Sequence, residues 1–160
     1  MRIDDACSAI GVASKKRLKD TRLFDLIMQD GKELAGVQGI YFFFAPDSTT
    51  CLYVGKNSSQ QFIERISAHL AISEASWMNH FLKYYKDHHQ SASLFAAANA
   101  AGECQILLMP TEDDLIAKAE RLFRIILKPL FNSLAPKRRS VSSIPPDTHI
   151  GEVLRNNLVP

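Results

Sequence analysis

Long apolar runs, closely spaced cysteines and a strong excess of charge of either sign are all missing from this 160-residue chain. No stretch approaches the roughly 20 apolar residues that cross a bilayer, and the first residues do not open like a secretion signal, so we expect a cytoplasmic protein without membrane contacts. The three cysteines, an odd number, are too widely spaced for a metal knuckle. We therefore expect reduced thiols, with Cys51 and Cys104 buried as small apolar residues.

The net charge is only +2 and the sequence pI is near 8.5, so the chain as a whole is not a polycation. Nucleic-acid binding would have to come from local clusters of positive charge. Basic residues gather in two places: Lys15, Lys16, Arg17 and Lys19, and then Arg121, Arg124, Lys128, Lys137, Arg138 and Arg139. Taken alone, such runs are most often solvated faces.

Apolar and turn residues predict mixed α and β structure. Residues 36–44 and 50–54 have strand character and are separated by the turn-forming Pro46-Asp47-Ser48-Thr49, which predicts an antiparallel hairpin. The run Tyr41-Phe42-Phe43-Phe44 is typical of a strand buried on both faces. A third strand is expected over residues 104–109, where Pro110 ends it.

Helical spacing of apolar residues predicts a helix after Lys56, with Ser58 or Ser59 as its cap, and further helices over residues 76–86 and after a Thr111 cap. Residues 92–101 are ambiguous between helix and strand. Residues 4–34 are expected to be helical in two pieces, with a packing arm as the favoured role over a dimer contact or a DNA-binding extension. From residue 134 the composition changes to a basic tail rich in proline and serine.

Several of these residues form an ordered set. Gly39-Ile40-Tyr41 is followed after eleven residues by Tyr53-Val54-Gly55, then by Arg65 and His69 four positions apart on a predicted helix, and later by Glu120 and Asn132. The set resembles the signature of the GIY-YIG endonucleases, with valine where the second triplet usually has isoleucine. The resemblance covers roughly residues 37–133.

The resemblance implies an α+β fold in which a small central antiparallel three-stranded sheet is flanked by helices. Residues 36–134 would form this nuclease-like core, residues 1–35 an N-terminal helical extension and residues 135–160 the tail. Helical spacing places Arg65 and His69 on the border of an apolar face, where side chains are partly desolvated yet open. Tyr53 is expected to orient the water or the phosphate, and Lys56 to add positive charge beside it.

The implied activity is metal-dependent DNA hydrolysis with Tyr41, Tyr53, Arg65, His69 and Glu120 as catalytic residues. Glu120 would hold a single divalent cation, Mg²⁺ with Mn²⁺ as a substitute, because magnesium accepts one protein carboxylate when a phosphate supplies further oxygens. Arg65 would bind the scissile phosphate. Tyr41 would be the general base, and His69 is a candidate to take its proton onward.

The expected substrate-binding residues are Lys56, Arg65 and Asn132. Asn132 is expected to brace the glutamate helix by hydrogen bonds more than to touch DNA. Within the nuclease interpretation, restriction, repair and recombination roles all stay open, as do DNA specificity and a homodimer or protein partner that supplies it. Outside it, two alternatives remain: a non-catalytic nucleic-acid-binding module of a larger assembly, and a plain interaction domain in which Glu120 is an ion-pair partner of a nearby arginine or lysine.

Overall fold

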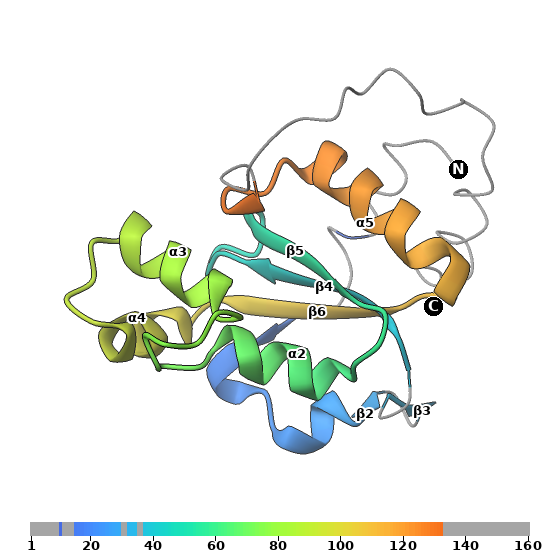
Figure 1. Cartoon of the computed structure of the whole chain (residues 1–160), viewed down its shortest axis with the longest axis horizontal. Helices are drawn as coiled ribbons and strands as arrows, with labels where there is room; N and C mark the ends of the chain where they lie inside the picture. The colour runs from blue at the N-terminus through green and yellow to red at the C-terminus, as the bar shows by residue number, and fades with distance from the viewer. Residues whose placement is uncertain (1–9, 11–14, 30–31, 35–36, 133–160) are drawn as a thin grey trace.

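A four-stranded antiparallel sheet forms the centre of the described molecule (Figure 1). The computed structural model describes residues 10, 15–29, 32–34 and 37–132. Along the sheet the strand order is β1, β6, β4, β5. Their bounds are β1 Lys16–Arg17, β4 Gly39–Phe44, β5 Cys51–Asn57 and β6 Gln105–Pro110. β1 and β5 are the outermost strands, so one edge of the sheet is a two-residue strand and the other is a seven-residue strand.

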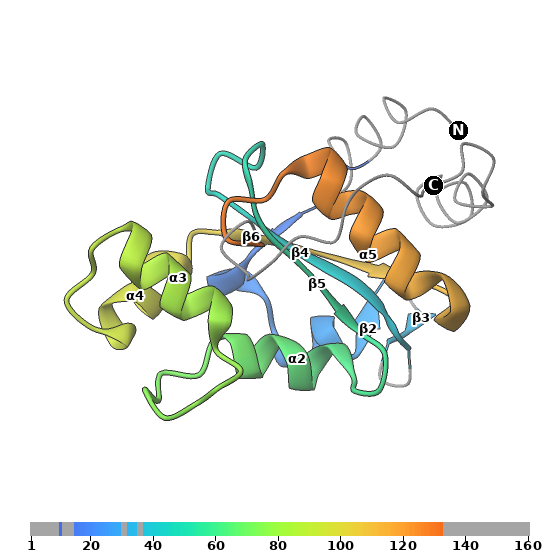
Figure 2. The same cartoon turned by 45° about the horizontal axis from the view of Figure 1, so that its top comes forward.

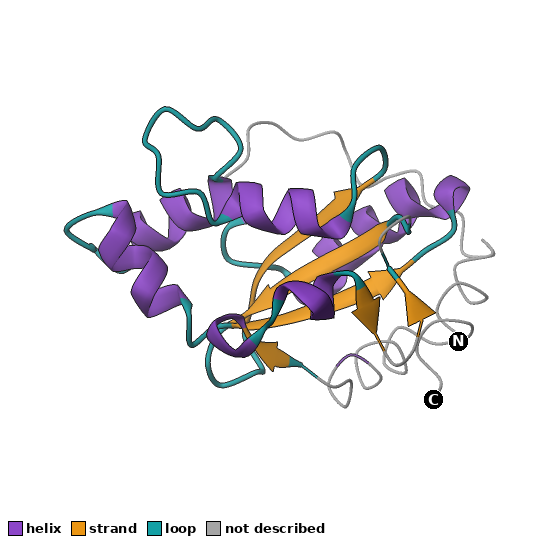
Figure 3. Ribbon diagram, turned by 90° about the horizontal axis from the view of Figure 1, so that it is seen from below, coloured by secondary structure: helices purple, strands orange, loops and turns teal. Residues whose placement is uncertain are grey.

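Helices cover both faces of this sheet (Figure 2). One face carries α2 (Phe62–His69), α3 (His80–His88) and α4 (Leu94–Ala101). The opposite face carries α5 (Asp113–Leu127). Figure 3 shows the resulting layers from below, with purple helices on either side of orange strands. The expected α+β architecture with an antiparallel sheet between helices is therefore confirmed.

Alternation along β4 explains why both faces need a cover. Tyr41 and Phe43 belong to the core beneath α2, α3 and α4. Ile40, Phe42 and Phe44 belong to the core beneath α5, where Phe123 packs edge-on against Phe42. All six residues of the strand are buried, as the aromatic run predicts for a central strand with two covered faces.

The hairpin between β4 and β5 forms at the predicted turn. The side chain of Asp47 accepts hydrogen bonds from the backbone N–H groups of Thr49 and Thr50, at 2.9 and 3.0 Å. This satisfies turn amides that would otherwise lack partners and sets the hairpin register. In that register Tyr41 lies opposite Gly55, and Phe43 lies opposite Tyr53. The second strand continues to Asn57, three residues beyond its expected end at Val54.

The three-strand prediction was wrong, because the N-terminal region supplies a fourth strand. Residues 4–34 were expected to be helical. Of their described part, Ile10 is helical, but residues 15–34 contain two 3₁₀ turns, Leu18–Asp20 and Leu23–Leu26, and the short strands β1, β2 (Met28–Gln29) and β3 (Lys32–Glu33). In β1, Lys16 pairs with Ile106 of β6. This pairing gives hydrogen-bond partners to backbone groups of β6 that would otherwise be exposed at the edge of the sheet. Helix propensity depends on nearby residues only and does not include such a long-range pairing.

Helix starts were predicted less well than helix faces. The first core helix begins at Phe62 after Gln61, whose backbone N–H donates to Glu64 at 2.9 Å, so the serines at 58 and 59 are not its caps. The next helix begins at His80 and leaves Trp77 76% exposed, although Trp77 was placed on its apolar side. Residues 94–101 form α4, which resolves the ambiguous segment as a helix.

At the start of α5 the hydroxyl of Thr111 donates to the carbonyl of Met109, so it does not cap the helix as expected. Cys51 and Cys104 are buried free thiols, as predicted, and Cys7 lies outside the described residues. The basic run at 137–139 also lies outside them. None of the helices in the described part of the chain combines the length and the apolar character that a membrane crossing requires.

Candidate active site at the β5 edge

A pocket of about 260 Å³ opens at the β5 edge of the sheet. It is lined by residues from four elements and one loop, namely Tyr41, Tyr53, Gly55, Lys56, Asn57, Ser58, Ser59, Gln60, Arg65, Glu120 and Arg124. Because β5 is an edge strand, side chains from the α2 face and from the α5 face meet around it. The described lining holds three cationic side chains and one carboxylate, so the pocket has an excess of positive charge.

A missing side chain on β5 makes room for the first tyrosine. A Cβ atom at Gly55 would lie 2.2 Å from Cζ of Tyr41, well inside the contact distance of two carbon atoms. The direct pairing of these two residues across the hairpin therefore requires glycine. At Gly39 a Cβ would lie 2.2 Å from the carbonyl oxygen of Met109, so this glycine serves close strand packing.

The hydroxyl of Tyr41 is hydrogen-bonded to a histidine inside the protein. Its oxygen lies 2.6 Å from Nε2 of His69. Nδ1 of the same ring accepts a hydrogen bond from the backbone N–H of Phe81, at 3.5 Å, near the start of α3. An imidazole nitrogen that accepts carries no proton, so a neutral His69 has its proton on Nε2 and donates it to Tyr41.

His69 is only 1% exposed, which corrects the expectation of a partly open border position. Both ring nitrogens have partners, and this is what allows a polar ring to be buried at this position. Burial, with a smaller contribution from the positive charge of Arg65, lowers the pKa of His69 to about 3. The imidazole is therefore neutral at pH 7, and with Nε2 already protonated it is a hydrogen-bond donor to Tyr41 and a poor acceptor of its proton.

The two phenols lie side by side on the α2 face of the sheet. The rings of Tyr41 and Tyr53 are stacked with their centroids 6.3 Å apart. Burial raises the pKa of Tyr41 strongly, and the positive charge of Arg65 acts in the opposite direction. Burial also raises the pKa of Tyr53, against which the charge of Arg124 acts. Both hydroxyls are thus protonated at neutral pH in the free protein.

The guanidinium of Arg65 enters the pocket from α2. Its Nη1 donates to the side-chain oxygen of Gln60 at 3.4 Å, a long contact. Its Nε is buried and has no hydrogen-bond partner among the described residues, and the same is true of Nε of Arg124. Buried donors without partners are rare in native proteins. Two arginines of one pocket each carry such a donor.

Glu120 enters from α5 and is held by two cations. One carboxylate oxygen lies 2.7 Å from Nη2 of Arg124, and the other lies 3.2 Å from Nζ of Lys56. The side chain of Glu120 is 13% exposed, against 37% for Lys56 and 38% for Arg124. We call these three residues the Glu120 clamp. The sequence offered Arg121, Arg124 or Lys128 as ion-pair partners of Glu120; the structure shows Arg124 in this role and adds Lys56 from the strand.

Asn132 braces a strand and not the glutamate helix. Its side-chain oxygen accepts from the backbone N–H of Val54 at 2.6 Å, and its side-chain nitrogen donates to the carbonyl of Val54 at 3.0 Å. Nη2 of Arg124 donates to the same carbonyl at 3.4 Å. Because β5 is an edge strand, these outward backbone groups have no strand to pair with, and Asn132 takes that place.

The structure thus places five of the seven predicted site residues on the pocket wall. They are Tyr41, Tyr53, Lys56, Arg65 and Glu120. His69 lies behind Tyr41, and Asn132 lies on the outer side of β5. Sequence reasoning missed Arg124 as a lining residue, although its position four residues after Glu120 on one helix places the two side chains on neighbouring turns. It also missed the polar loop at 57–60.

The lining suits a cation that the protein holds through a single carboxylate. The described residues contain no cluster of three or more histidine, cysteine, aspartate or glutamate side chains that could enclose a metal ion. Magnesium does not need such a cluster when substrate phosphate and water complete its shell. Glu120 could provide the protein ligand once an oxygen is released from the clamp.

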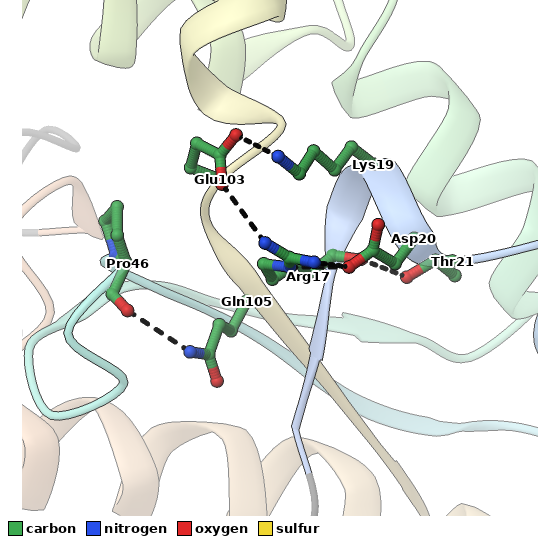
Figure 4. Close-up of polar contacts among 7 residues, drawn as sticks. All are labelled: Arg17, Lys19, Asp20, Thr21, Pro46, Glu103 and Gln105. Atoms are coloured by element: carbon green, nitrogen blue, oxygen red, sulfur yellow. Dashed lines mark hydrogen bonds and ion pairs between the residues drawn. The ribbon is translucent and has the colours of Figure 1, made fainter.

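The N-terminal basic cluster lies at the other edge of the sheet, where Lys16, Arg17 and Lys19 are paired with acids and Lys15 donates to a backbone carbonyl. Figure 4 shows the pairs of Arg17 and Lys19. Lys19 and Arg17 both contact Glu103, and Arg17 also contacts Asp20. Lys16 lies 3.1 Å from Asp25. The cluster therefore fastens β1 to the turn before β6 and adds no positive charge to the pocket edge.

Comparisons of the chain with family models, with curated proteins and with solved structures gave no match. The function is therefore inferred from the chemistry of the site itself.

Proposed function

We propose that this protein is a metal-dependent DNA endonuclease of the GIY-YIG type. The observation that carries the proposal is the convergence of Tyr41, Tyr53, Arg65 and Glu120 on one pocket with excess positive charge. These residues come from β4, β5, α2 and α5 and span eighty positions of the sequence, so their meeting is a property of the fold. The buried unpartnered Nε atoms of Arg65 and Arg124 support an anionic substrate.

Phosphodiester hydrolysis needs a positioned water, positive charge on the phosphoryl oxygens and stabilisation of the leaving oxygen. In the proposed reaction a water oxygen bonds to phosphorus, the bond from phosphorus to the 3′ oxygen breaks, and the water proton passes to a base while the 3′ oxygen gains a proton. Arg65 binds the phosphate, because its planar donors match two phosphate oxygens. The tyrosine hydroxyls orient the water by hydrogen bonds.

Tyr41 is the proposed base in its phenolate form: its own proton leaves to solvent through the pocket before the water attacks, and the phenolate then takes the water proton. His69 is its positioning residue. The neutral imidazole donates from Nε2 to the phenol oxygen and fixes its direction. The same hydrogen bond stabilises negative charge on that oxygen. The charge of Arg65 opposes the effect of burial on the pKa of Tyr41. The proton route onward from Tyr41 to His69 is not favoured by this geometry.

Glu120 would hold the divalent cation, Mg²⁺ or Mn²⁺. When bound, such an ion supplies positive charge to the leaving oxygen and to the phosphoryl group. Lys56 and Arg124 would contribute charge from the α5 face of β5, opposite Arg65. Asn132 holds β5 in place at Val54 and is a positioning residue in this proposal.

A second candidate is a nucleic-acid-binding module that does not cut. It is favoured by the clamp, in which both oxygens of Glu120 are taken by cations of the protein. In that case the pocket would bind a backbone phosphate and Glu120 would only position Lys56 and Arg124.

Digestion separates the two functions. Purified full-length protein is incubated with supercoiled, linear and branched DNA in Mg²⁺ or Mn²⁺, and the ends are sequenced. We expect metal-dependent cleavage that is lost in Glu120→Ala and Arg65→Ala with folding retained by circular dichroism. DNA that stays uncut at several protein concentrations, together with binding that survives Glu120→Ala, would support the binding module and overturn the nuclease.

A further inference from the structure

The Glu120 clamp poses a problem that the proposed nuclease has to solve. A carboxylate whose two oxygens contact Arg124 and Lys56 at 2.7 and 3.2 Å keeps further lone pairs, but the two positive charges beside it oppose the approach of a divalent cation. At 13% exposure, Glu120 is also shielded from solvent that would weaken these ion pairs. Metal binding to Glu120 is therefore favoured when one or both cations leave it.

Arg124 has a second possible partner within the same pocket. Its guanidinium lines the pocket, its buried Nε lacks a partner among the described residues, and its remaining contact to the carbonyl of Val54 is long, at 3.4 Å. Lys56 lines the pocket as well. A phosphate that reaches Arg65 therefore also meets Lys56 and Arg124, whose donors match its oxygens.

We infer that Arg124 is a phosphate-binding residue that exchanges partners, so that a backbone phosphate draws Arg124 and Lys56 from Glu120 and thereby frees the carboxylate for the divalent cation. The inference rests on the proposed function and deepens it, since it assigns a role to a residue that the resemblance does not include. The clamp keeps Glu120 neutralised until substrate is present. Phosphate and metal then bind cooperatively, and each raises the affinity of the site for the other.

The exchange predicts a particular pattern of metal affinities in the variant Arg124→Gln. Without DNA, the variant should bind Mn²⁺ about tenfold more tightly than the wild type, because a charge-assisted contact no longer competes for Glu120. With saturating DNA, the wild type and the variant should bind Mn²⁺ about equally, because Arg124 has already left the carboxylate. The cooperativity between DNA and metal is therefore smaller in the variant.

The measurement is a titration of the full chain with Mn²⁺, followed by the paramagnetic resonance signal of the free ion, with and without a 20-base-pair duplex. It is run at low temperature and completed before cleavage appears on a denaturing gel. Arg121→Gln, an exposed residue of the same helix that does not line the pocket, is the matched control and should behave as wild type in all titrations. Lys56→Gln is a second test and should repeat the pattern with a smaller gain.

The duplex affinity provides an independent readout. Arg124→Gln should weaken duplex binding in the absence of metal and reduce the slope of log affinity against log salt by about one phosphate contact. The variant thus gains cation affinity while it loses anion affinity.

An equal gain in Mn²⁺ affinity with and without DNA would overturn the exchange, because Arg124 would then stay on Glu120 in both states. Unchanged duplex binding by Arg124→Gln would overturn it as well. These results are distinguishable from failure of the nuclease proposal. Cleavage with unchanged cooperativity removes the exchange alone, whereas reduced cooperativity without cleavage removes the nuclease alone.

Discussion

The two edges of the sheet carry similar kinds of residues in opposite arrangements. At the β1 edge, Arg17 and Lys19 meet Asp20 and Glu103, so two cations face two carboxylates, and their side chains are 45–50% exposed (Figure 4). At the β5 edge, three cations and one carboxylate line the pocket, and the carboxylate is 13% exposed. Ion pairs alone therefore do not mark a site.

The β5 edge differs from the β1 edge because its cationic side chains outnumber its carboxylates. A charge-balanced and exposed cluster satisfies itself, and such ion pairs contribute little to stability. An unbalanced and partly buried cluster with unpartnered arginine Nε atoms is unfavourable unless something else binds there. Basic runs along the sequence therefore do not single out the pocket, because only Arg124 of its three cations belongs to such a run. The acidic neighbours that the fold supplies decide which cations are available to a ligand.

The largest expected difference between the edges is in cleavage. Arg65→Ala and Glu120→Ala at the β5 edge should each lower the cleavage rate by about 10³-fold, because each removes charge stabilisation from the transition state. Arg65→Lys should still lose about 10²-fold, since lysine lacks the planar pair of donors. The rates are measured on plasmid DNA under single-turnover conditions.

Arg17→Ala at the β1 edge is the control for these variants and should cleave at the wild-type rate. If Arg17→Ala lost as much activity as Arg65→Ala, the distinction between the edges would fail.

The next largest difference between the two edges should be in the free energy of unfolding after glycine is replaced by alanine. Gly55→Ala should destabilise the protein by about 3 kcal/mol, because the added Cβ would lie 2.2 Å from the ring of Tyr41. The matched change near the β1 edge is Gly102→Ala, where the nearest atom is the carbonyl oxygen of Asn99 at 3.1 Å and the backbone is right-handed helical. Its effect should stay within about 1 kcal/mol. Urea unfolding measures both, and equal costs would contradict the proposed contact.

Acid sensitivity should come from the β5 side through His69. Its pKa is lowered to about 3 in the folded protein, so below the ordinary value near 6.5 the unfolded chain binds a proton that the folded chain does not. Stability should therefore fall as the pH is lowered from 6.5 toward 3. At pH 5 the loss from this one group should be about 2 kcal/mol relative to pH 7.5.

The variant His69→Gln removes this titration and should show a correspondingly smaller fall between pH 7.5 and 5, whatever its stability at pH 7.5. Lys19→Gln at the β1 edge should keep the wild-type fall. Parallel pH profiles for the wild type and His69→Gln would show that the histidine is not buried in neutral form.

The smallest effect should come from the β1 ion pairs themselves. Glu103→Gln removes the carboxylate that both Arg17 and Lys19 contact, yet its side chain is 47% exposed and screened by water. The expected loss is below about 1 kcal/mol by urea unfolding, with cleavage unchanged. A loss of several kcal/mol would mean that this edge depends on its ions for stability.

Local pattern predicted a good deal of this molecule. The aromatic alternation of β4, the turn at Asp47 and the stripe of α5 were all readable, because each depends on residues close in the sequence. The helix starts at Phe62 and His80 were not, because loop residues between elements carry weak signals. The strand at Lys16 could not be anticipated either, since two residues hold no periodicity and the pairing depends on an edge formed ninety positions later.

The sequence by itself determined which residues could do chemistry and in what order they come along the chain, because residue type and helical or strand spacing are local properties. The tertiary structure alone decided that Tyr41 and Glu120 share one pocket, that His69 is buried as a donor behind Tyr41, and that Glu120 is held by a strand lysine as well as by Arg124. The physical reason is that charge and burial act through space. A carboxylate or an imidazole acquires its role from neighbours that the chain brings to it only when the sheet has formed.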